Sequence, residues 1–269
     1  MSRTGSNTVL LTGAAGSIGT VLAHELPAYG HRLRLLDSKP IDADDTVLAD
    51  LTNDAGSAAL DAAMDGLESV VHLAAIPTEA PFADILRVNI DGTYRVFDAA
   101  RRAGVRRIVY ASSNHAVGFT PRAPMVGVDV PPRPDTYYGL SKVFGEALGR
   151  LYADRYGLEV ACLRIGSFAE RPTSHRHLST WLSHGDAVRL LHAGLSTPDL
   201  TYAVVYGISA NTRAWWDLAP GHRLGYHPVD DAETYAAQIV AEHGQPDLGA
   251  RTEAFLGGEY TDQRYDTPR

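Results

Sequence analysis

The sequence has little cysteine, few basic residues and no long apolar run, and each shortage excludes a class of protein. Cys162 is the only cysteine in 269 residues, so the chain cannot build an internal disulfide framework. Lysine and arginine total 24 against 32 acidic residues, a net charge of −8, whereas a nucleic-acid binder needs a basic surface to displace counterions from phosphates. No stretch reaches the roughly 18 apolar residues that span a bilayer. We therefore expect a cytoplasmic protein without nucleic-acid or membrane partners.

The sequence does contain short β-branched or leucine-rich runs that alternate with longer helical patterns. The runs predict strands at residues 8–11, 32–36, 70–73, 107–110 and 158–165. The helical patterns lie at residues 17–29, 81–103 and 137–156. Such alternation is typical of a parallel sheet covered by helices on both faces. The expected fold class is α/β, a Rossmann doubly wound parallel sheet.

A glycine-rich turn lies between the first predicted strand and the first predicted helix. Gly13 would permit a tight turn, Gly16 would let backbone N–H groups approach a pyrophosphate, and Gly19 would allow close packing of the helix on the strand. Glycine also serves plain turns. Because a strand precedes this turn and a helix follows it, we favour a dinucleotide site.

Asp37 ends the second predicted strand, at the distance from the glycine turn where an acid meets the ribose hydroxyls of adenosine. A carboxylate there would repel the 2′-phosphate of NADP, so the expected cofactor is NAD. Arg34 and Lys39 are evidence against this choice of NAD, since either could pair with a phosphate. Asp50, beside Leu51, could face the adenine or could simply cap a strand end.

The composition changes after residue 166, where loops rich in proline, histidine, glycine and tryptophan replace the regular alternation. Only a helix at residues 178–193 and a strand at 202–206 are predicted there. We expect an NAD-binding Rossmann domain at residues 1–165 and, at 166–269, a small C-terminal substrate lobe interleaved with it. The polar final segment of about 25 residues is expected to wrap the surface.

A phenol and an ammonium group lie four residues apart at the start of a predicted helix, as Tyr138 and Lys142. This spacing puts them on one helix face. A neighbouring cation stabilises a phenolate, so we expect Lys142 to lower the pKa of Tyr138 towards the operating pH of a general base. Ser112 and Ser113 follow the predicted strand 107–110 and would bring a hydroxyl to the same edge of the sheet. The glycine turn, a serine and this pair together predict hydride transfer.

These residues resemble the motifs of the extended short-chain dehydrogenase/reductases. The matching segments are the glycine turn at 13–19, NIDGT at 89–93, YASS at 110–113 and the Tyr138/Lys142 pair. More narrowly, the chain resembles the uronate dehydrogenases. The matching segments are SSNH at 112–115 with Gly118, RPD at 133–135, RIGS at 164–167, LSTW at 178–181, SH at 183–184, WWD at 215–217 and GG at 257–258.

The resemblance implies oxidation of a hexuronic acid, D-galacturonate or D-glucuronate, at C1 of the pyranose. The product would be the aldaric acid 1,5-lactone, because the ring oxygen stays attached. The implied catalytic residues are Ser113, Tyr138 as general base, and Lys142. The implied substrate residues are Ser113, Asn114, His115, Tyr138, Ser167 and Arg176. The implied cofactor residues are Gly13, Gly16, Ser17, Ile18, Gly19, Asp37, Asp50, Leu51, Leu73, Ala74, Ala75, Asn89, Tyr138, Lys142 and Ile165.

Physical chemistry favours the same substrate, because the planar fork of an arginine suits a buried carboxylate. Arg176 lies in the loop that enters the lobe, although a helix-surface arginine is the alternative. His115 follows the catalytic serine closely and could bind a ring hydroxyl, or could be a buried core histidine. The resemblance places a substrate-contacting serine where this chain has Pro77. That contact is lost unless Thr78 replaces it, so both sugar acids stay open.

Histidines and tryptophans of the lobe admit two interpretations. His175, His177 and His184 could suggest a metal, but no cysteine or carboxylate accompanies them at ligand spacing, so we expect none. Trp215 and Trp216 could stack on a sugar face, but packing within the lobe is favoured.

Two other functions remain open. A nucleotide-sugar epimerase or dehydratase would need a larger lobe to hold a nucleoside diphosphate than the residues after 165 provide. A non-enzymatic NAD-sensing regulator could use the same fold, but it has no need of a Tyr/Lys pair beside a serine. We also expect a homo-oligomer, because the amphipathic helices predicted at 81–103 and 137–156 could pair with those of a second copy.

Overall fold

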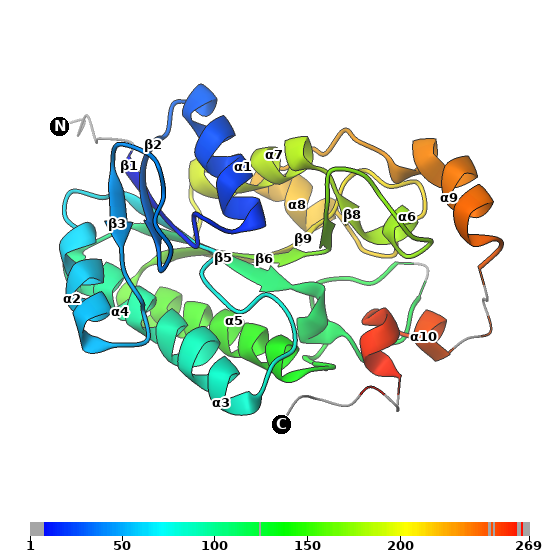
Figure 1. Ribbon diagram of the computed structural model, residues 1–269, viewed down its shortest axis with the longest axis horizontal. Coiled ribbons are helices and arrows are strands. Elements are labelled where there is room, and N and C mark those ends of the chain that lie inside the picture. Colours follow the sequence, from blue (N-terminus) through cyan, green and yellow to red (C-terminus); the bar gives the residue numbers. More distant parts are fainter. Residues whose placement is uncertain (1–7, 124, 247–248, 250, 263–264, 266–269) are drawn as a thin grey trace.

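A seven-stranded parallel sheet forms the centre of the computed structural model, which describes residues 8–123, 125–246, 249, 251–262 and 265 (Figure 1). Its strands are β1 (Thr8–Thr12), β2 (Arg32–Asp37), β3 (Thr46–Leu48), β4 (Ser69–His72), β5 (Arg107–Ser113), β6 (Glu159–Ile165) and β9 (Tyr202–Gly207). They lie in the order β3-β2-β1-β4-β5-β6-β9, so the winding direction reverses between β1 and β4. In doubly wound sheets, ligands bind outside the carboxyl ends of the strands at this reversal.

Helices cover both faces of the sheet, which confirms the predicted fold class. The α-helices are α1 (Ser17–Glu25), α2 (Asp54–Ala63), α3 (Phe82–Ile85), α4 (Gly92–Ala103), α5 (Tyr137–Tyr156), α6 (His177–Thr180), α7 (His184–Ser196), α8 (Ala219–Leu224), α9 (Ala236–His243) and α10 (Arg251–Ala254). Short helical turns are η1 (Leu26–Tyr29), η2 (Leu86–Asp91), η3 (Asn114–Val117), η4 (Ala232–Tyr235) and η5 (Gly258–Thr261). In Figure 1, α1, α7 and α8 lie above the sheet, and α2 to α5 lie below it.

Alternate residues of the central strands pack on opposite faces of the sheet. In β5, Val109 and Ala111 join the apolar cluster under α1 and α7, whereas Ile108 and Tyr110 join the cluster under α4 and α5. Both clusters are buried, which explains why the strands are almost continuously hydrophobic. Burying each such side chain contributes about 1.5–3 kcal/mol, so the sheet gives the site a rigid floor.

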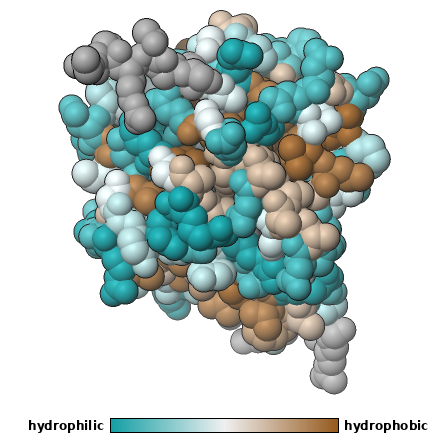
Figure 2. Space-filling model, turned by 90° about the vertical axis from the view of Figure 1, so that its left-hand side faces the viewer, coloured by the Kyte–Doolittle hydropathy of each residue, from teal (hydrophilic) through white to brown (hydrophobic). Residues whose placement is uncertain are grey.

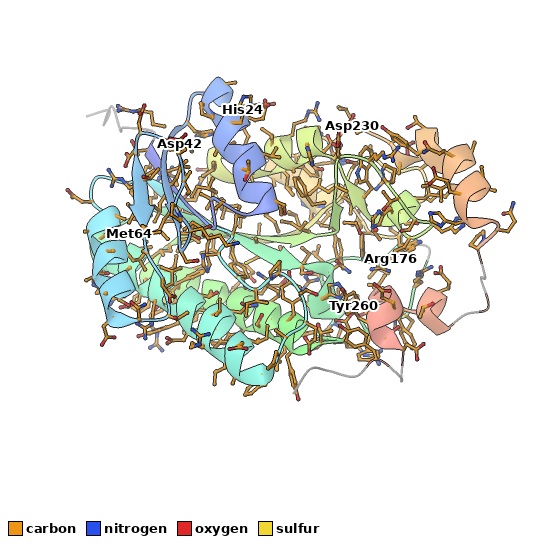
Figure 3. All side chains as sticks on the ribbon, viewed as in Figure 1. His24, Asp42, Met64, Arg176, Asp230 and Tyr260 are labelled. Carbon is orange, nitrogen blue, oxygen red and sulfur yellow. The ribbon has the colours of Figure 1, made fainter. Side chains whose placement is uncertain are left out.

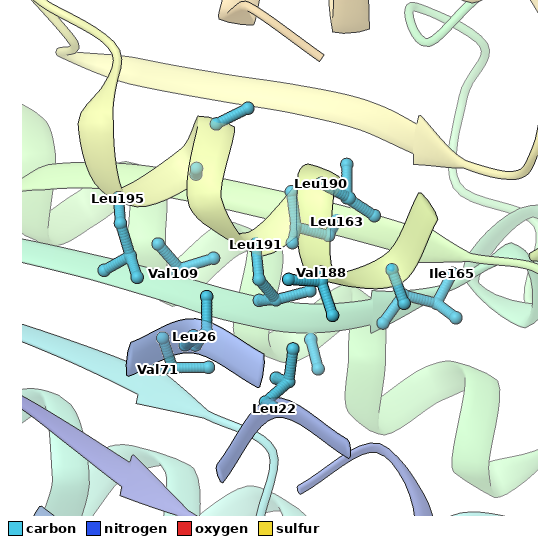
Figure 4. Packing of buried hydrophobic residues seen from close by; sticks show 14 of the residues in the cluster. Leu22, Leu26, Val71, Val109, Leu163, Ile165, Val188, Leu190, Leu191 and Leu195 are labelled. Carbon is cyan, nitrogen blue, oxygen red and sulfur yellow. The ribbon is translucent and has the colours of Figure 1, made fainter. Parts of the chain in front are cut away.

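The first cluster is seen in Figure 4, where α1, η1 and α7 meet over the sheet. Leu22 and Leu26 pack with Val188 and Leu191, and all four side chains are at most 3% exposed. This packing sets the position of α1, and hence of the turn that precedes it.

The region around residues 178–193 differs from the single helix that the sequence predicts. Helix α6 ends at Thr180, a short strand β8 (Trp181–Leu182) pairs with β7 (Ser167–Phe168), and α7 begins at His184. The Ser183 hydroxyl accepts a hydrogen bond from the Asp186 backbone N–H at 2.9 Å, so an N-cap starts a new helix there.

Residues 166–269 add strand β9 to the large sheet, beside β6. The boundary at residue 165 between a Rossmann domain and a substrate lobe stays a prediction. Strands from both sides of this boundary belong to the same sheet. Hydrophilic residues surround a smaller apolar area on the side of the molecule that carries β3 and α2 (Figure 2). Within the described ranges, no helix is long and apolar enough to cross a membrane.

His72 is buried between two threonines beneath the glycine turn. Its Nδ1 lies 2.8 Å from the Thr12 hydroxyl and its Nε2 lies 3.1 Å from the Thr93 hydroxyl. Burial lowers the pKa of His72 to about 3, and the positive charge of Lys142 acts in the same direction. The imidazole is therefore neutral in the folded protein near neutral pH.

Acidification is expected to destabilise the protein through His72. The unfolded chain binds a proton below its histidine pKa of 6.5, whereas the folded chain binds one only below about 3. Stability therefore rises with pH across that window, and lowering the pH from about 7 to about 5 should remove about 2 kcal/mol of unfolding free energy through this group. Urea unfolding of the wild type and of His72→Gln at both pH values isolates the effect, because the other histidines titrate in both proteins. Equal pH slopes in the two proteins would contradict it.

Candidate active site

One cavity of about 830 Å³ lies at the carboxyl ends of the strands and contains both the glycine turn and the Tyr/Lys pair. Nearly all the cofactor and substrate residues predicted from the sequence line it. These are Gly13, Gly16, Ser17, Ile18, Gly19, Asp37, Asp50, Leu51, Leu73, Ala74, Ala75, Ser113, Asn114, His115, Tyr138, Lys142, Ile165, Ser167 and Arg176. The tertiary structure thus brings together segments from the whole length of the chain.

The glycine turn requires glycine at two positions for reasons visible in the backbone. Gly13 has a φ of +71°, and a Cβ there would lie 2.7 Å from the backbone nitrogen of Ala74. A Cβ on Gly19 would lie 2.2 Å from the Gly13 carbonyl oxygen. Gly16 is the N-cap of α1 and has no side chain to satisfy the first N–H groups of the helix. Those groups can therefore bind a phosphate at the positive end of the helix dipole.

Asp37 lies at the end of β2 on the cavity wall. Its carboxylate accepts hydrogen bonds from the backbone N–H groups of Ala15 and Lys39, both at 3.0 Å, which hold it beside the glycine turn. Arg34 is engaged elsewhere, because it pairs with Asp45 at 3.0 Å. Lys39 lines the cavity, so of the two predicted competitors only Lys39 faces the cofactor side.

Asp50 lies beyond the end of β3 and also lines the cavity. One of its carboxylate oxygens accepts hydrogen bonds from the Thr52 hydroxyl at 2.7 Å and from the Thr52 backbone N–H at 2.9 Å. These bonds lower the pKa of Asp50. The carboxylate therefore stabilises a turn while it faces the cavity, and both interpretations of this residue remain compatible with its position.

Two elements, β5 and α5, bring the predicted catalytic residues together. Ser113 is the last residue of β5, and Tyr138 and Lys142 lie one turn apart at the start of α5. The Ser113 hydroxyl acts on the Tyr138 phenol and lowers its pKa. The Lys142 Nζ donates to the Ala111 carbonyl oxygen at 2.8 Å. The Thr136 hydroxyl caps α5 by accepting from a backbone N–H at 2.9 Å. A serine, a phenol and a lysine therefore face one cavity.

Burial controls the charge states of this pair. It raises the pKa of Tyr138 to about 12, although the hydrogen bond from Ser113 acts the other way. Burial also lowers the pKa of Lys142 to about 7. The prediction that the pKa of Tyr138 falls towards neutral pH is wrong for the protein without a bound cofactor. The Lys142 Nζ lies 5.3 Å from the centroid of the phenol ring, and the desolvation of both groups outweighs their attraction.

Arg176 lines the cavity, and one of its guanidinium nitrogens has no hydrogen-bond partner among the described residues. Its Nη2 donates to the Leu256 carbonyl oxygen, whereas its Nη1 is buried and has no hydrogen-bond partner among the described residues. Burial lowers the pKa of Arg176 to about 10, and the charge of Arg122 adds to the lowering. Figure 3 labels Arg176 and Tyr260 close to each other, and both residues line the cavity. A buried cation with a free donor favours an anionic ligand.

Polar groups surround Arg176. With its amide oxygen directed at Arg176, Asn114 accepts from Nη2 at 3.1 Å and donates to the Ile165 carbonyl oxygen at 3.1 Å. The Ser167 hydroxyl lies 2.8 Å from that of Thr180. These groups give the cavity several hydrogen-bonding positions beside one cation, as a sugar acid requires.

The loop after β4 contains the position where the family resemblance implies a serine. Pro77 lines the cavity, and Thr78 is not among the described residues of its wall. Asn89, predicted to bind the cofactor, lies behind this loop and does not line the cavity. Its amide accepts from the Ile76 backbone N–H at 2.8 Å and donates to the Ile76 carbonyl at 3.0 Å. Its role in cofactor binding stays a prediction, and its observed contacts hold the loop.

The polar segment near the C-terminus, which was expected to wrap the surface, also reaches the core and the cavity. Leu256 is fully buried, and Glu259 and Tyr260 line the cavity. The Gly257 backbone N–H donates to the Gly118 carbonyl oxygen at 2.8 Å, which fixes this segment against the turn after β5. Its polar composition does not indicate a place in the cavity wall. In the sequence, the GG pair at 257–258 was the feature that linked this segment to the site.

Glu79 was also missed, since no motif contains it. This residue is 7% exposed, and its carboxylate accepts a hydrogen bond from the Tyr138 backbone N–H at 2.9 Å. A negative charge at the start of α5 stabilises the helix dipole and supports the phenol's position.

The lobe histidines and tryptophans form no metal site or sugar platform in the described part of the chain. No group of three or more histidine, cysteine or acidic side chains there could hold a metal ion. Trp216 is 1% exposed and stacks on Tyr206. Trp215 faces Arg122, whose guanidinium carbon lies 3.8 Å from the ring centroid.

Comparison with known proteins agrees with this geometry. A family model described as the NAD dependent epimerase/dehydratase family matches residues 9–204. A uronate dehydrogenase of Agrobacterium fabrum is 43% identical over 258 residues, which cover 94% of this chain and 96% of the relative. A uronate dehydrogenase of Pseudomonas putida is 42% identical over 247 residues, which cover 90% and 91%. The crystal structure of an Agrobacterium tumefaciens uronate dehydrogenase mutant complexed with NAD is 42% identical, with a TM-score of 0.89 and coverage of 95% and 97%. The chain therefore belongs to the NAD-dependent epimerase/dehydratase family and, within it, to the uronate dehydrogenase group.

Proposed function

We propose that this protein oxidises a hexuronic acid at C1 of its pyranose ring, with NAD⁺ as the hydride acceptor. The observation that carries the proposal is that Arg176 lines the same cavity as Ser113, Tyr138 and Lys142, while its Nη1 has no hydrogen-bond partner among the described residues. A carboxylate on the sugar would supply the missing partner and would orient C1 towards the phenol.

The cofactor residues on the cavity wall fit NAD⁺. The N-terminus of α1 would hold its pyrophosphate, and Asp37 would bind its ribose hydroxyls. When bound, NAD⁺ supplies the hydride acceptor and a positive charge near the phenol.

The chain's own residues perform the proton chemistry. Tyr138 takes the proton of the C1 hydroxyl as the hydride leaves C1, and Ser113 donates a hydrogen bond to the same oxygen. Lys142 stabilises the phenolate. Because the ring oxygen keeps its bond to C1, the product is the aldaric acid 1,5-lactone. Positioning and charge stabilisation account for most of the rate enhancement.

An assay of NADH formation tests the proposal directly. The panel should contain galacturonate, glucuronate, mannuronate, the matching neutral hexoses and a hexose phosphate, whose anion differs in shape from a carboxylate. We expect turnover with one or more uronates and little with neutral sugars. NAD that stays bound and is regenerated in each cycle would instead favour a nucleotide-sugar epimerase. No turnover with any sugar acid would favour a non-enzymatic NAD sensor.

Removing the charge of Asp37 is expected to relax the choice of cofactor. In Asp37→Ser, the repulsion of a 2′-phosphate is lost, so the ratio of kcat/KM for NADP⁺ to that for NAD⁺ should rise by roughly tenfold or more, which corresponds to ~1.4 kcal/mol. Asp42→Ser is the matched control, because Asp42 is exposed and does not line the cavity. Wild-type protein that uses both cofactors equally would contradict the assignment.

A homo-oligomer and a cytoplasmic location complete the proposal. Helices α4 and α5 expose Tyr94, Leu140 and Leu151, each more than 40% accessible, so a second copy could cover this face. Sedimentation velocity tests the assembly, and a single monomeric species would contradict it. Cell fractionation tests the location, and recovery outside the cytoplasmic fraction would contradict it.

A further inference from the structure

Asp135 is a buried carboxylate just before α5 that the proposed reaction does not yet use. Its side chain has 0% exposure. A Cβ on Gly118 or on Gly257 would lie 1.9 Å from Asp135 Oδ2. The carboxylate therefore occupies a space that exists only because both neighbouring residues are glycines. A charge enclosed in this way needs specific partners, since burial without them is costly.

The His115 imidazole is hydrogen-bonded to Asp135 in the described part of the chain. Its Nδ1 lies 2.8 Å from Asp135 Oδ2, and the other oxygen, Oδ1, accepts from the Thr136 hydroxyl at 3.1 Å. A carboxylate can only accept, so the proton of this contact lies on Nδ1 of the imidazole. The contact joins the start of α5 to η3, the turn that follows the catalytic serine.

The rest of the His115 ring is held by aromatic contacts. The Tyr260 ring lies edge-on at 4.7 Å between centroids, and the Tyr138 ring lies edge-on at 6.0 Å. His115 keeps 17% of its side chain exposed and lines the cavity. Across the described residues, no hydrogen bond engages its Nε2. The second ring nitrogen is thus left to the cavity.

We propose that Asp135 is a positioning residue that holds His115 as the neutral, Nδ1-protonated tautomer, so that Nε2 accepts a hydrogen bond from a hydroxyl of the sugar ring. This inference rests on the proposed function, and it adds a selectivity element to the carboxylate clamp. Arg176 recognises the anion, whereas the Asp135–His115 pair recognises a donor on the ring. Without Asp135, the imidazole could turn or carry its proton on Nε2, and a donor would then face the hydroxyl where an acceptor is required.

The test compares two substitutions of Asp135 that differ in one property. Asp135→Asn keeps the size of the side chain and an oxygen that accepts from Nδ1, so KM for the uronate should stay within about threefold of the wild type. Asp135→Ala removes the acceptor and should raise that KM by roughly 10- to 100-fold, the range expected for a hydrogen bond to a charged group. KM for NAD⁺ should not change in either variant. Equal KM values for the two variants would overturn the proposal.

A double-mutant cycle separates positioning from a merely structural role. In a His115→Gln background, Asp135→Ala should raise KM no further, because its effect passes through the imidazole. If Asp135 only supports the fold, its effect should multiply that of His115→Gln, and the proposal is then wrong. Thermal unfolding of each variant identifies any loss of folded protein.

Nitrogen NMR of the imidazole provides a readout that does not depend on turnover. In the wild type at mildly alkaline pH, we expect Nδ1 protonated and Nε2 unprotonated, with the signals assigned by their absence in His115→Gln. Asp135→Ala should shift the proton to Nε2. A wild-type imidazole protonated at Nε2 would refute the pairing. If the wild type oxidises no uronate, the proposed function fails while these signals still decide the role of Asp135.

Discussion

Tyr138→Phe is expected to reduce kcat for uronate oxidation by roughly a thousandfold, the middle of the range for a lost general base. The phenol faces Ser113 in the cavity and is the group assigned to take the proton of the C1 hydroxyl in the proposed reaction. Phenylalanine fills the same buried space, so the dissociation constant for NAD⁺ should stay within about twofold. Steady-state kinetics and NAD⁺ titration measure the two quantities.

The pH dependence of the wild type provides a second check on this base. Burial holds the pKa of Tyr138 at about 12, so the phenolate fraction grows as the pH rises. The oxidation rate should therefore increase from neutral to alkaline pH, but less steeply than the phenolate fraction, because Lys142, with a pKa of about 7, loses its stabilising charge over the same range. Tyr94→Phe is the matched control, because Tyr94 is 46% exposed on α4 and should keep wild-type turnover. Turnover of Tyr138→Phe within tenfold of the wild type would remove the phenol from the mechanism.

Arg176→Ala is expected to lower kcat/KM for uronates by roughly 100-fold or more, the ~3 kcal/mol that loss of one partner from a buried ion pair costs. Most of the change should lie in KM, because the guanidinium binds the carboxylate in both the ground state and the transition state. Activity on neutral hexoses should change far less. The measured quantity is therefore the ratio of kcat/KM for a uronate to that for its neutral sugar.

Arg122→Ala controls for the structural part of this effect. Arg122 also contacts the C-terminal segment, through the Glu253 carboxylate and the Phe255 carbonyl oxygen, but it does not line the cavity. Its loss should loosen that segment and leave the selectivity ratio close to wild type. If Arg176→Ala leaves the ratio unchanged, or the wild type oxidises neutral hexoses as well as uronates, the carboxylate clamp is wrong.

The elements and motifs that depend on neighbours in the sequence could be predicted. Alternating apolar runs placed most strands and helices of the large sheet, although not β3 or α2, and the helix at residues 137–156 has the predicted bounds. The glycine turn, Asp37 and the Tyr138/Lys142 pair required only local spacing, and all of them line the cavity. Short-range periodicity is sufficient for such features, because strands and helices repeat every two or 3.6 residues.

Features that depend on contacts between distant segments could not be predicted. The break between α6 and α7 follows from Ser183 and β8, since an apolar run alone does not indicate that a helix stops. In the sequence, Asp135 is a polar residue before a predicted helix. Only the structure shows that its carboxylate occupies the space left by the missing side chains of Gly118 and Gly257. Tyr260 lies in a polar segment, yet packs on His115 in the active site.

By itself, the sequence determined where most strands lie along the chain, the position of the dinucleotide site and the three residues proposed for the chemistry, because each depends on local pattern. The tertiary structure decided the electrostatics of the site. Whether a phenol, an ammonium or a guanidinium is stripped of water depends on packing from several elements. That packing raises the pKa of Tyr138, lowers that of Lys142 and leaves one donor of Arg176 without a partner in the part of the chain that the structure describes. The sequence shows which residue types are present, but only the folded structure shows how deeply each side chain is buried.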